Sequence, residues 1–416
     1  MITFNRNLTD LILREMQNTP AIFVNGPRQA GKTTLVKRIA ENYPNSEYIT
    51  FDDISSYAAA SADPQNFLQI TKSPLIIDEV QMVPDLFREL KKQIDALRFA
   101  KGKAANGKYI LTGSTNIMAL PEIARALVGR VSIFTLYQLS ACEVVNRSPK
   151  FLDFAYAENV NKFDVQNIPY TLEQIISKAT FPEIASNPTI NSSNWFSSYV
   201  TTLIQRDVRS IVEIEKLAAL PHMLHVLAAR VGGLINEASL ARDLGLNVMT
   251  MKRYRSLFNA LFLLLNLQPW FRNIGKRFVK AQKLYFSDTY LLCYLLGVDI
   301  INLRKQDANL FGKVLENFVA SELSKQLTLV NNINLFHFRT HDAKEIDFIL
   351  ERADGKIVAI EVKARDYVTL KDFNVIQDLK QSINKDFIKG IILYSGEKII
   401  PFAEDLFAVP LQLLFC

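Results

Sequence analysis

Cysteine is scarce in this sequence, with three residues among 416, and long apolar runs are missing. Cys142, Cys293 and Cys416 are widely scattered and share no metal-ligand spacing, which argues against a disulfide framework or a cysteine metal site. No apolar run approaches the roughly 20 residues that a membrane-spanning helix needs. The segment Met1–Met16 lacks the apolar core of a signal peptide. We therefore expect a soluble cytoplasmic protein with no membrane partner.

Acidic residues are absent from one long window, between Asp243 and Asp288. The whole chain carries a net charge of +6 and this window carries +8, so the remaining residues sum to −2. A basic region of this kind is typical of a surface that binds a polyanion. The positive residues of the window are Lys252, Arg253, Arg255, Arg272, Lys276, Arg277, Lys280 and Lys283.

Hydrophobic residues make up 49% and charged residues 22% of the chain, which is ordinary globular usage and argues against disorder. No internal repeat is visible. We expect an α/β domain over residues 1–145 and a connecting region over 146–194, with one short helix after a capping box at Thr171. A mostly helical region then covers 195–305, and a second α/β domain covers 306–416.

Short apolar strands alternate with helical patterns at the start of the chain, which predicts parallel βαβ units. The strands expected there are Ala21–Val24, Tyr48–Phe51, Leu75–Ile77, Tyr109–Thr112 and Val131–Leu136, with helices at Lys32–Glu41 and around Leu86, Leu90, Ile94 and Leu97. In the last domain we expect a helix at Phe311–Leu327 and strands at Ile333–Arg339, Glu345–Glu351 and Lys356–Ala364.

The strongest motif is a glycine-rich loop that ends in Lys32 and Thr33 and matches G-x-x-x-x-G-K-[ST]. It follows a predicted strand and opens a predicted helix, so its backbone N–H groups and the helix terminus can surround phosphate oxygens. Lys32 would reach the β- and γ-phosphates of ATP, and the Thr33 hydroxyl would ligate Mg²⁺. The expected nucleotide-binding residues are Gly26, Pro27, Arg28, Gln29, Ala30, Gly31, Lys32, Thr33 and Thr34.

A second apolar strand ends in two acids, Asp78 and Glu79. Asp78 would hold Mg²⁺, and Glu79 would orient and polarise the attacking water. Taken alone, the pattern also fits a strand followed by a solvated acidic turn. The loop at Lys32 favours the catalytic interpretation.

Two further catalytic roles have weaker signals. Ser114 follows a third strand and is our candidate for sensing the γ-phosphate, although it also fits a plain strand-terminating turn. An arginine must usually neutralise the charge that develops in the transition state. Arg130, Arg206 and Arg209 are candidates, and each also fits an ordinary surface arginine.

The basic window contains a helix-turn-helix pattern, with helices at Glu237–Leu244 and Met249–Leu263 around a turn at Gly245. In such modules the second helix enters the major groove of DNA. The segment Trp270–Phe286 alternates apolar and basic residues, which suits a β-hairpin wing that contacts phosphates. A winged helix used for packing or protein contacts fits equally well. The candidate contacts to DNA or RNA, within residues 250–283, are Lys252, Arg253, Arg255, Lys276 and Arg277.

Acidic residues recur in the last domain at positions that can converge. Glu316 lies in a predicted helix and Asp347 in a strand, while Glu361 and Lys363 are two apart on one strand face. The three carboxylates could hold Mg²⁺ or Mn²⁺, and the ion would activate a water molecule with Lys363 assisting. A solvent face with ordinary ion pairs is the alternative.

With these motifs in place, the chain resembles the prokaryotic AAA-superfamily ATPases that carry a winged-helix region and a restriction-endonuclease-like C-terminal domain. The resemblance covers nearly the whole length. It implies a RecA-like P-loop core with ATP as ligand, and it places Glu316, Asp347, Glu361 and Lys363 at the PD-(D/E)xK nuclease positions. The segments that carry it are GPRQAGKTT, IIDEVQMVPDLFRELKKQID, LTGST, LVGRV, LSACE, LIQRDV, INEASLARDLG, KRFVKAQKLYFSDT, EIDFIL and IEVKA.

Three functions remain open at this point. The first is an Mg²⁺-dependent ATPase that forms ADP and phosphate and is coupled to nucleic-acid binding. The second is an ATP-regulated, metal-dependent nuclease. The third is a nucleotide-switched binding module whose nuclease-like tail is inactive. An oligomer is compatible with each of them.

Overall fold

The computed structural model describes residues 4–114, 127–208, 219–277 and 280–415. By its internal contacts the chain divides into two compact units. The N-terminal unit consists of Asn5–Gln138 with Phe258–Leu263, and the C-terminal unit consists of the remaining residues. Among the described helices, none is both long and apolar enough to cross a membrane.

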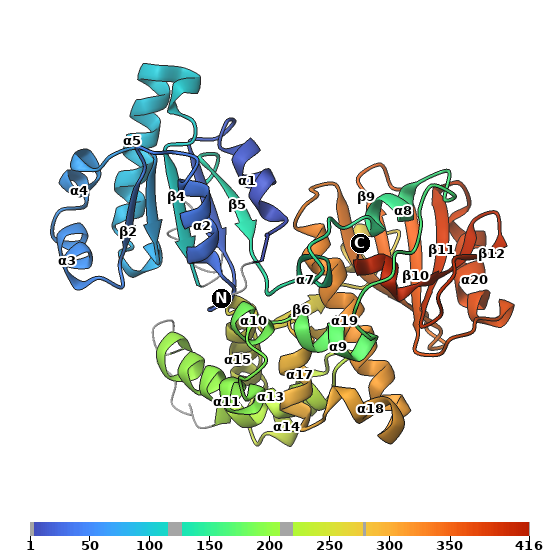
Figure 1. The fold of residues 1–416 in the computed structure, drawn as a ribbon. Helices are drawn as coiled ribbons and strands as arrows, with labels where there is room; N and C mark the ends of the chain where they lie inside the picture. Colours follow the sequence, from blue (N-terminus) through green and yellow to red (C-terminus); the bar gives the residue numbers. More distant parts are fainter. Residues whose placement is uncertain (1–3, 115–126, 209–218, 278–279, 416) are drawn as a thin grey trace. The chain divides into compact units, whose positions relative to one another are not determined.

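The N-terminal unit is built on a five-stranded parallel sheet in the order β2-β3-β4-β1-β5 (Figure 1). The residues of β1, β3 and β4 are buried, because helices cover both faces of a doubly wound parallel sheet. The strands lie where the apolar runs predict them, within one or two residues at each end. They are β1 (Ala21–Asn25), β2 (Glu47–Thr50), β3 (Leu75–Asp78), β4 (Tyr109–Gly113) and β5 (Val131–Thr135).

Helices connect these strands and supply the rest of the core. Leu86, Leu90 and Ile94 repeat at helical spacing and are completely buried, as the pattern predicts. They join Phe23, Ile77 and other strand residues in one apolar cluster. The helical elements of this unit are α1 (Leu8–Glu15), α2 (Lys32–Ala40), α3 (Ile54–Ala62), α4 (Pro64–Ile70), η1 (Val80–Met82), α5 (Leu86–Lys101) and η2 (Gly102–Ala105).

The connecting region holds more structure than its sequence predicts. The expectation of one short helix is wrong, because Phe151 and Phe154 are fully buried on an additional helix. The capping box at Thr171 and Gln174 is present as expected. Short helices interrupted by prolines give too few apolar positions for a clear period. The region contains α7 (Ala141–Val144), α8 (Phe151–Tyr156), α9 (Leu172–Lys178), α10 (Pro182–Ser186) and the start of α11 (Ser192–Thr202).

The middle of the chain is mostly helical, and its hairpin begins earlier than predicted. The second helix ends at Ala260 instead of Leu263, since Phe262 adopts a left-handed conformation with φ of 59°. Leu264–Leu267 then pairs with Lys283–Phe286 in an antiparallel ladder. The elements are η4 (Leu203–Val208, a π-helix), α13 (Ala219–Ala229), α14 (Glu237–Asp243), α15 (Val248–Ala260), β6 (Leu264–Leu267), α16 (Ile274–Arg277), β7 (Lys283–Phe286), α17 (Thr289–Leu296) and α18 (Ile300–Gln306).

The last part of the chain forms a six-stranded mixed sheet in the order β12-β13-β11-β10-β9-β8. Ile357 and Ala359 pack on one face with Ile376 and Leu379 of α20 (Asn374–Ile383). The long helix α19 (Ala308–Leu327) also packs against this sheet. The strands are β8 (Ile333–Arg339), β9 (Glu345–Arg352), β10 (Ile357–Lys363), β11 (Phe387–Tyr394), β12 (Ile400–Ala403) and β13 (Leu406–Pro410), with short turns η5 (Leu370–Phe373), η6 (Asn384–Asp386) and η7 (Leu411–Phe415).

Candidate functional site

Three of the predicted ATPase elements meet at one edge of the N-terminal sheet. Since β1, β3 and β4 are parallel, their carboxyl ends share that edge. The loop that begins at Gly26, the acid Asp78 and the residue Ser114 each follow or end one of these strands. This edge is where ligands bind in open α/β sheets.

The loop has a backbone that only glycine permits at its first position. Gly26 has φ of 146°, and a Cβ atom built there would lie 2.1 Å from the carbonyl oxygen of Leu136. Gly31 has φ of 93° and directly precedes α2. The Lys32 ammonium is buried and donates to the carbonyl oxygens of Gly26 at 2.9 Å and Pro27 at 2.8 Å. The chain therefore wraps around the lysine and presents the first turn of α2.

An arginine that sequence reasoning missed supports the loop. The Arg6 guanidinium donates to the carbonyl oxygens of Ala30 and Tyr137, both at 2.6 Å. It thereby ties the loop to the segment that leaves β5. Position 6 lies outside any recognisable motif, so the sequence offers no signal for this role. Of the other loop residues, Arg28 is half-buried, while Gln29, Thr33 and Thr34 are exposed.

Asp78 is the centre of a hydrogen-bond network. The Thr33 hydroxyl donates to Oδ2 of Asp78 at 2.6 Å, and the Tyr48 hydroxyl donates to the same oxygen at 2.8 Å. The Thr112 hydroxyl donates to Oδ1. Burial, together with the neighbouring Asp78, raises the pKa of Tyr48 above its ordinary value, so this phenol stays a donor. Tyr48 and Thr112 come from strands on either side of β3, and no spacing in the sequence marks them.

Glu79 lies beside Ser114. Its backbone is left-handed, with φ of 57°, and its amide donates to the Thr112 hydroxyl at 3.2 Å. The Ser114 hydroxyl donates to Oε2 of Glu79 at 3.1 Å. Gln81 Nε2 donates to Glu79 and, at 3.2 Å, to Ser114. Gln81 was not among the predicted site residues, although it follows Asp78 and Glu79 in the segment IIDEVQMVPDLFRELKKQID.

Arg130 is not brought to this edge. It precedes β5, whose first residue pairs with Ala21, and therefore lies at the amino ends of the strands. Its guanidinium forms a bidentate ion pair with Asp95, from Nε to Oδ1 at 2.6 Å and from Nη2 to Oδ2 at 2.9 Å. Of the other candidate arginines, Arg206 lies in η4 with a side chain outside the described atoms, and Arg209 lies outside the described residues.

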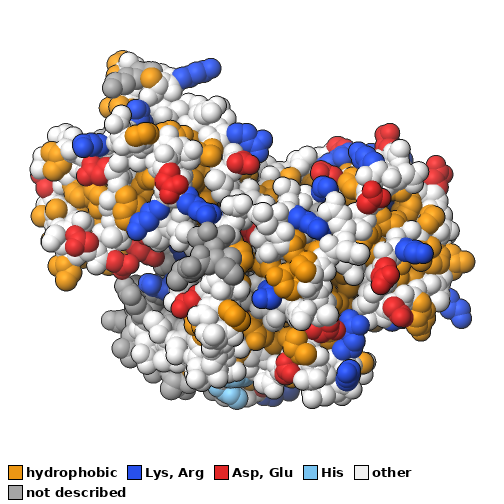
Figure 2. Space-filling view, viewed as in Figure 1, with side chains coloured by type: hydrophobic (Ala, Val, Ile, Leu, Met, Phe, Trp, Pro, Cys, Tyr) orange, Lys and Arg blue, Asp and Glu red, His pale blue; other side chains and the backbone are white. Residues whose placement is uncertain are grey.

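Some cations of the basic window are exposed to solvent, and others form ion pairs with carboxylates of the same chain. Lys252 and Arg253 on α15 are exposed, as is Lys276. Arg255 instead pairs with Glu237 at 2.6 Å. Arg277 is buried, pairs with both oxygens of Glu351 and donates to the backbone of Phe271. On the face drawn in Figure 2, basic and acidic side chains are interspersed over the described surface.

The expectation that Arg255 and Arg277 contact nucleic acid is therefore not supported by their placement. Both guanidinium groups satisfy carboxylates of the same molecule, and withdrawing Arg277 would leave Glu351 without its buried partner. The sequence pattern left a phosphate-contacting wing and a packing role equally open, and the chain between β6 and β7 packs on β8 through Pro269 and His337. His337 donates its amide to Gln268, and Trp270 donates its amide to His337.

The structure brings together the four acidic and basic residues predicted in the last domain. Lys363 Nζ lies 2.8 Å from Oε1 of Glu361, and the Asp347 amide donates to Oε2 of Glu361 at 3.3 Å. Glu316 joins them through Lys283 of β7. The Lys283 ammonium lies 2.7 Å from Oε1 of Glu316 and 3.5 Å from Oδ1 of Asp347. Sequence analysis counted Lys283 only as one basic residue of the window.

Burial and mutual repulsion set the electrostatics of this acidic cluster, which we define as Glu316, Asp347 and Glu361. Burial, with the charge of Asp347, raises the pKa of Glu316 to about 7 and that of Glu361 to about 8. Burial alone would lower the pKa of Lys283, but the charges of Glu316 and Asp347 outweigh it and the pKa is raised. Lys283 is therefore an ammonium ion at neutral pH.

The acidic cluster does not fit a metal ion in this arrangement. Among the described residues, no group of three or more His, Cys, Asp and Glu side chains could hold one. Each of the three carboxylates already accepts from the chain: besides the lysines, the Val362 amide donates to Oδ2 of Asp347 at 2.9 Å, and the Tyr285 hydroxyl donates to Oε1 of Glu316 at 2.5 Å. The predicted metal site of the last domain is thus replaced by internal ion pairs.

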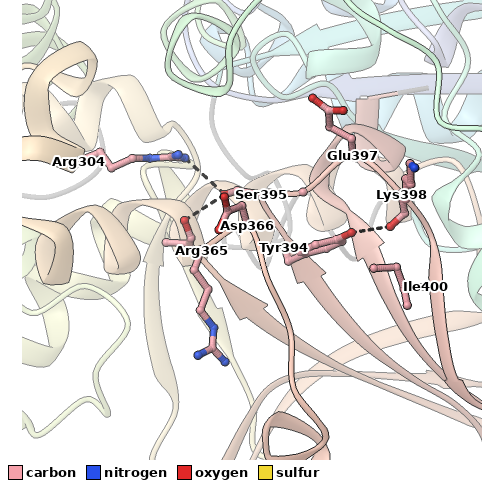
Figure 3. Close-up of a pocket in the computed structure, with 10 residues that line it drawn as sticks. Arg304, Arg365, Asp366, Tyr394, Ser395, Glu397, Lys398 and Ile400 are labelled. Atoms are coloured by element: carbon pink, nitrogen blue, oxygen red, sulfur yellow. Dashed lines mark hydrogen bonds between the residues drawn. The ribbon is translucent and has the colours of Figure 1, made fainter.

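A polar pocket of about 730 Å³ opens where β10 and β11 end (Figure 3). Arg304, Arg365, Glu397 and Lys398 are among the residues that line it, and the two arginines contact protein acceptors. Arg304 donates to the Ser395 hydroxyl at 3.4 Å and pairs with Glu173 at 3.2 Å. Arg365 pairs with Asp372. The pocket therefore offers a mixed surface without a convergent charge.

Comparison with family models divides the chain into three matched segments. Residues 18–145 match an AAA domain model. These residues contain the loop, Asp78, Glu79 and Ser114 at one sheet edge. They resemble a P-loop domain of the AAA type. The match supports nucleotide binding by this domain. Residues 170–301 match a domain of unknown function (DUF8612), and residues 311–414 match another (DUF4143).

Two mycobacterial proteins match nearly the whole chain. The uncharacterized proteins Mb2031c of Mycobacterium bovis and Rv2008c of Mycobacterium tuberculosis are each 26% identical over 411 residues. The match covers 99% of this chain and 84% of each relative. Among solved structures, the Walker-type ATPase PABY2304 of Pyrococcus abyssi is 14% identical with a TM-score of 0.41, covering 70% of this chain and 96% of that one. Cdc6p of Pyrobaculum aerophilum is 13% identical with a TM-score of 0.26, covering 72% and 92%.

Proposed function

We propose that the AAA-type domain binds ATP with Mg²⁺ and hydrolyses the β–γ phosphate bond. The observation that carries this proposal is the contact between the Thr33 hydroxyl and Asp78, which joins the phosphate loop to the acidic strand end. Two motifs separated by 45 residues converge there, as phosphoryl transfer requires. A glycine-rich turn of purely structural origin gives no reason for this convergence.

The loop binds the phosphates through its backbone. The conformations of Gly26 and Gly31 bring N–H groups close to the ligand, and the amino terminus of α2 adds positive potential. Lys32 rests on loop carbonyls and reaches the β- and γ-phosphates by exchanging those acceptors for phosphate oxygens. Arg6 keeps the loop in place during this exchange.

Thr33 and Asp78 would hold the magnesium ion. Their fit rests on chemistry visible in the structure, since a hydroxyl and a carboxylate oxygen lie 2.6 Å apart at the mouth of the loop. Hard oxygen donors of this kind suit Mg²⁺, which keeps several waters and phosphate oxygens as its other ligands. When bound, the ion neutralises charge on the phosphate oxygens. Tyr48 and Thr112 orient the Asp78 carboxylate.

Glu79 orients and polarises the attacking water. Its carboxylate accepts hydrogen bonds from Ser114 and Gln81, which fix its direction at the strand edge. Ser114 is in place to sense the γ-phosphate, because the same hydroxyl contacts the catalytic acid. The transition-state arginine is then not Arg130 of the same chain. An arginine of a neighbouring subunit is one source, which would make the active form an oligomer.

Release of phosphate by the full-length protein tests this proposal. Replacing Lys32 by alanine should abolish both nucleotide binding and turnover, because the ammonium contacts the phosphates directly. The matched control is Lys103→Ala, which removes an exposed lysine outside the loop. Unchanged phosphate release by the Lys32 variant contradicts the proposal.

We infer that the middle region is a winged helix coupled to this ATPase. Its support is the order of elements: α13, a bridge at Leu234, α14, α15, then β6 and β7. Lys252 and Arg253 are exposed on the second helix of the pair, where such modules contact the DNA major groove. DNA or RNA is the partner that this surface fits.

For the last domain, a non-cleaving binding module is a better candidate than a nuclease. The observation that favours it is the internal pairing of Glu316 and Asp347 with Lys283. DNA and RNA incubated with Mg²⁺ or Mn²⁺ should stay intact with the wild-type protein and with Glu361→Ala alike. Cleavage by the wild-type protein that disappears in the variant would instead support the nuclease.

A further inference from the structure

The acidic cluster of the last domain contains a cation that belongs to the chain itself. Lys283 has a side chain only 3% exposed, and its ammonium contacts carboxylates from two different elements, Glu316 of α19 and Asp347 of β9. Glu345 approaches it at 3.7 Å. An ammonium so deeply buried is stable only when its charge is compensated.

Backbone contacts on both sides hold Lys283 in this place. On one side Lys283 pairs with Leu267 in the β6–β7 ladder. On the other side Lys283 bridges to Leu234, and the next residue, Leu284, exchanges backbone hydrogen bonds with Gly232 and Gly233. The strand is therefore fixed from both edges, and the side chain enters the cluster as a consequence of the fold.

We propose that Lys283 is the resident cation of the acidic cluster and excludes divalent metal ions from it. A metal ion between Glu316 and Asp347 would lie within a few ångströms of the ammonium, and like charges at that separation repel strongly in a buried site. Lys363 and the Val362 amide already engage Glu361 and Asp347, so these two carboxylates offer less negative charge to a second cation. The chain thus carries a nuclease-like constellation in which a lysine takes the place of the metal.

The same argument predicts that one substitution opens a metal site. Lys283→Met keeps an unbranched apolar chain of similar length but removes the charge, which leaves Glu316 and Asp347 facing one another. Two carboxylates that contact the same ammonium can also share a metal ion, and their oxygens are hard ligands suited to Mn²⁺. We therefore expect the neutral variant to gain a divalent-ion site that depends on Asp347.

Titration of Mn²⁺ into nucleotide-free, full-length protein, with the free ion followed by electron paramagnetic resonance, tests this proposal. All variants carry Asp78→Asn, so that the proposed ATPase site contributes no binding and its own failure does not affect the result. We expect Lys283→Met to bind Mn²⁺ at least about tenfold more tightly than the Asp78→Asn parent. Adding Asp347→Asn should abolish that gain.

Two controls separate charge from packing. Lys280→Met removes an exposed lysine three residues earlier and should leave Mn²⁺ binding unchanged. Lys283→Arg keeps the charge and should also bind no additional ion. If Lys283→Met does not fold, as judged by circular dichroism, Lys283→Gln takes its place. The Asp78→Asn parent, which retains Lys283, provides an independent check. If this parent binds Mn²⁺ and Asp347→Asn removes that binding, the proposal is overturned. A folded, neutral variant without any gain overturns it as well.

Discussion

The Thr33 hydroxyl donates a 2.6 Å hydrogen bond to Oδ2 of Asp78, and so links the first turn of α2 to the carboxyl end of β3. Tyr48 donates to the same oxygen and Thr112 to the other, which leaves the carboxylate fixed in direction. A preorganised pair of oxygen ligands needs little rearrangement when a magnesium nucleotide arrives.

Removing the Thr33 hydroxyl should weaken the response to magnesium. Thr33→Val keeps the shape of the side chain but removes one ligand, so we expect the half-saturating Mg²⁺ concentration for phosphate release to rise by about tenfold or more. Thr71→Val, a threonine located before β3, should behave as the wild type. An unchanged Mg²⁺ titration of the Thr33 variant contradicts the assigned role.

Replacing the catalytic acid should separate ATP binding from hydrolysis. Glu79→Gln preserves the hydrogen bonds from Ser114 and Gln81 but removes the negative charge that polarises water. We expect ATP affinity within about threefold of the wild type and single-turnover hydrolysis lower by about 10²–10⁴-fold. Calorimetry measures the affinity and quenched-flow measures the rate. Equal losses in both quantities would show that Glu79 supports binding instead.

The exposed cations of α15 should determine the salt dependence of nucleic-acid binding. Lys252→Ala with Arg253→Ala removes two side chains that are free to contact phosphates, so the slope of log affinity against log salt should fall by about one unit for each lost contact. Fluorescence anisotropy with a labelled duplex and a labelled single strand measures the slope. A double variant with the wild-type salt slope would contradict the assignment of this surface to nucleic acid.

Arg277 provides the matched contrast, because it is basic, nearby in sequence and internally paired. Arg277→Ala leaves Glu351 partly buried without its partner, which should destabilise the C-terminal unit by about 3–5 kcal/mol. The salt slope of nucleic-acid binding should stay that of the wild type in the folded variant. A lower slope with unchanged thermal stability would place Arg277 on the nucleic-acid surface.

Stability should fall in mild acid through His337. Burial lowers the pKa of His337 to about 4, and its ring nitrogen contacts the carbonyl oxygen of Ala281. Between the ordinary pKa near 6.5 and this value, the unfolded chain takes up a proton that the folded chain refuses. The free energy of unfolding therefore decreases as the pH drops from 6.5 toward 4, by on the order of 3 kcal/mol in total.

Thermal unfolding between pH 4.5 and 7 measures this effect. His337→Gln should be less stable at pH 7 but should lose less on acidification than the wild type. His341→Gln removes an exposed histidine and should follow the wild-type profile. Identical pH profiles for the wild type and the His337 variant would show that other groups cause the acid sensitivity.

The ATPase motifs could be predicted from the sequence because the residues of each motif are close together in the chain. Gly26, Gly31 and Lys32 lie within seven consecutive residues, and the strand that precedes them is a short continuous apolar run, as expected of a strand buried on both faces. The acids at 78 and 79 end a similar run. The convergence of Ser114 with Glu79 was also predictable, since the carboxyl ends of parallel strands lie at one edge.

Other contacts required the folded chain. Tyr48 and Thr112 contact Asp78 from neighbouring strands, and Arg6 supports the loop from a segment with no motif. Strands β11 to β13 were not predicted, and the additional helix α8 was missed because its apolar residues form no repeating pattern.

The sequence by itself determined the phosphate loop, the acidic strand end and the positions of the last domain's carboxylates, since these depend on residue type and spacing along one chain. Tertiary structure alone decided which charges are free. Arg277 and Lys283 belong to the same basic window as Lys252 in the sequence, yet the fold buries the first two against carboxylates and leaves the third in solvent. The physical reason is that burial and neighbouring charges decide whether a charged side chain is paired or exposed to solvent. Packing creates these surroundings by bringing together side chains that are far apart in the sequence.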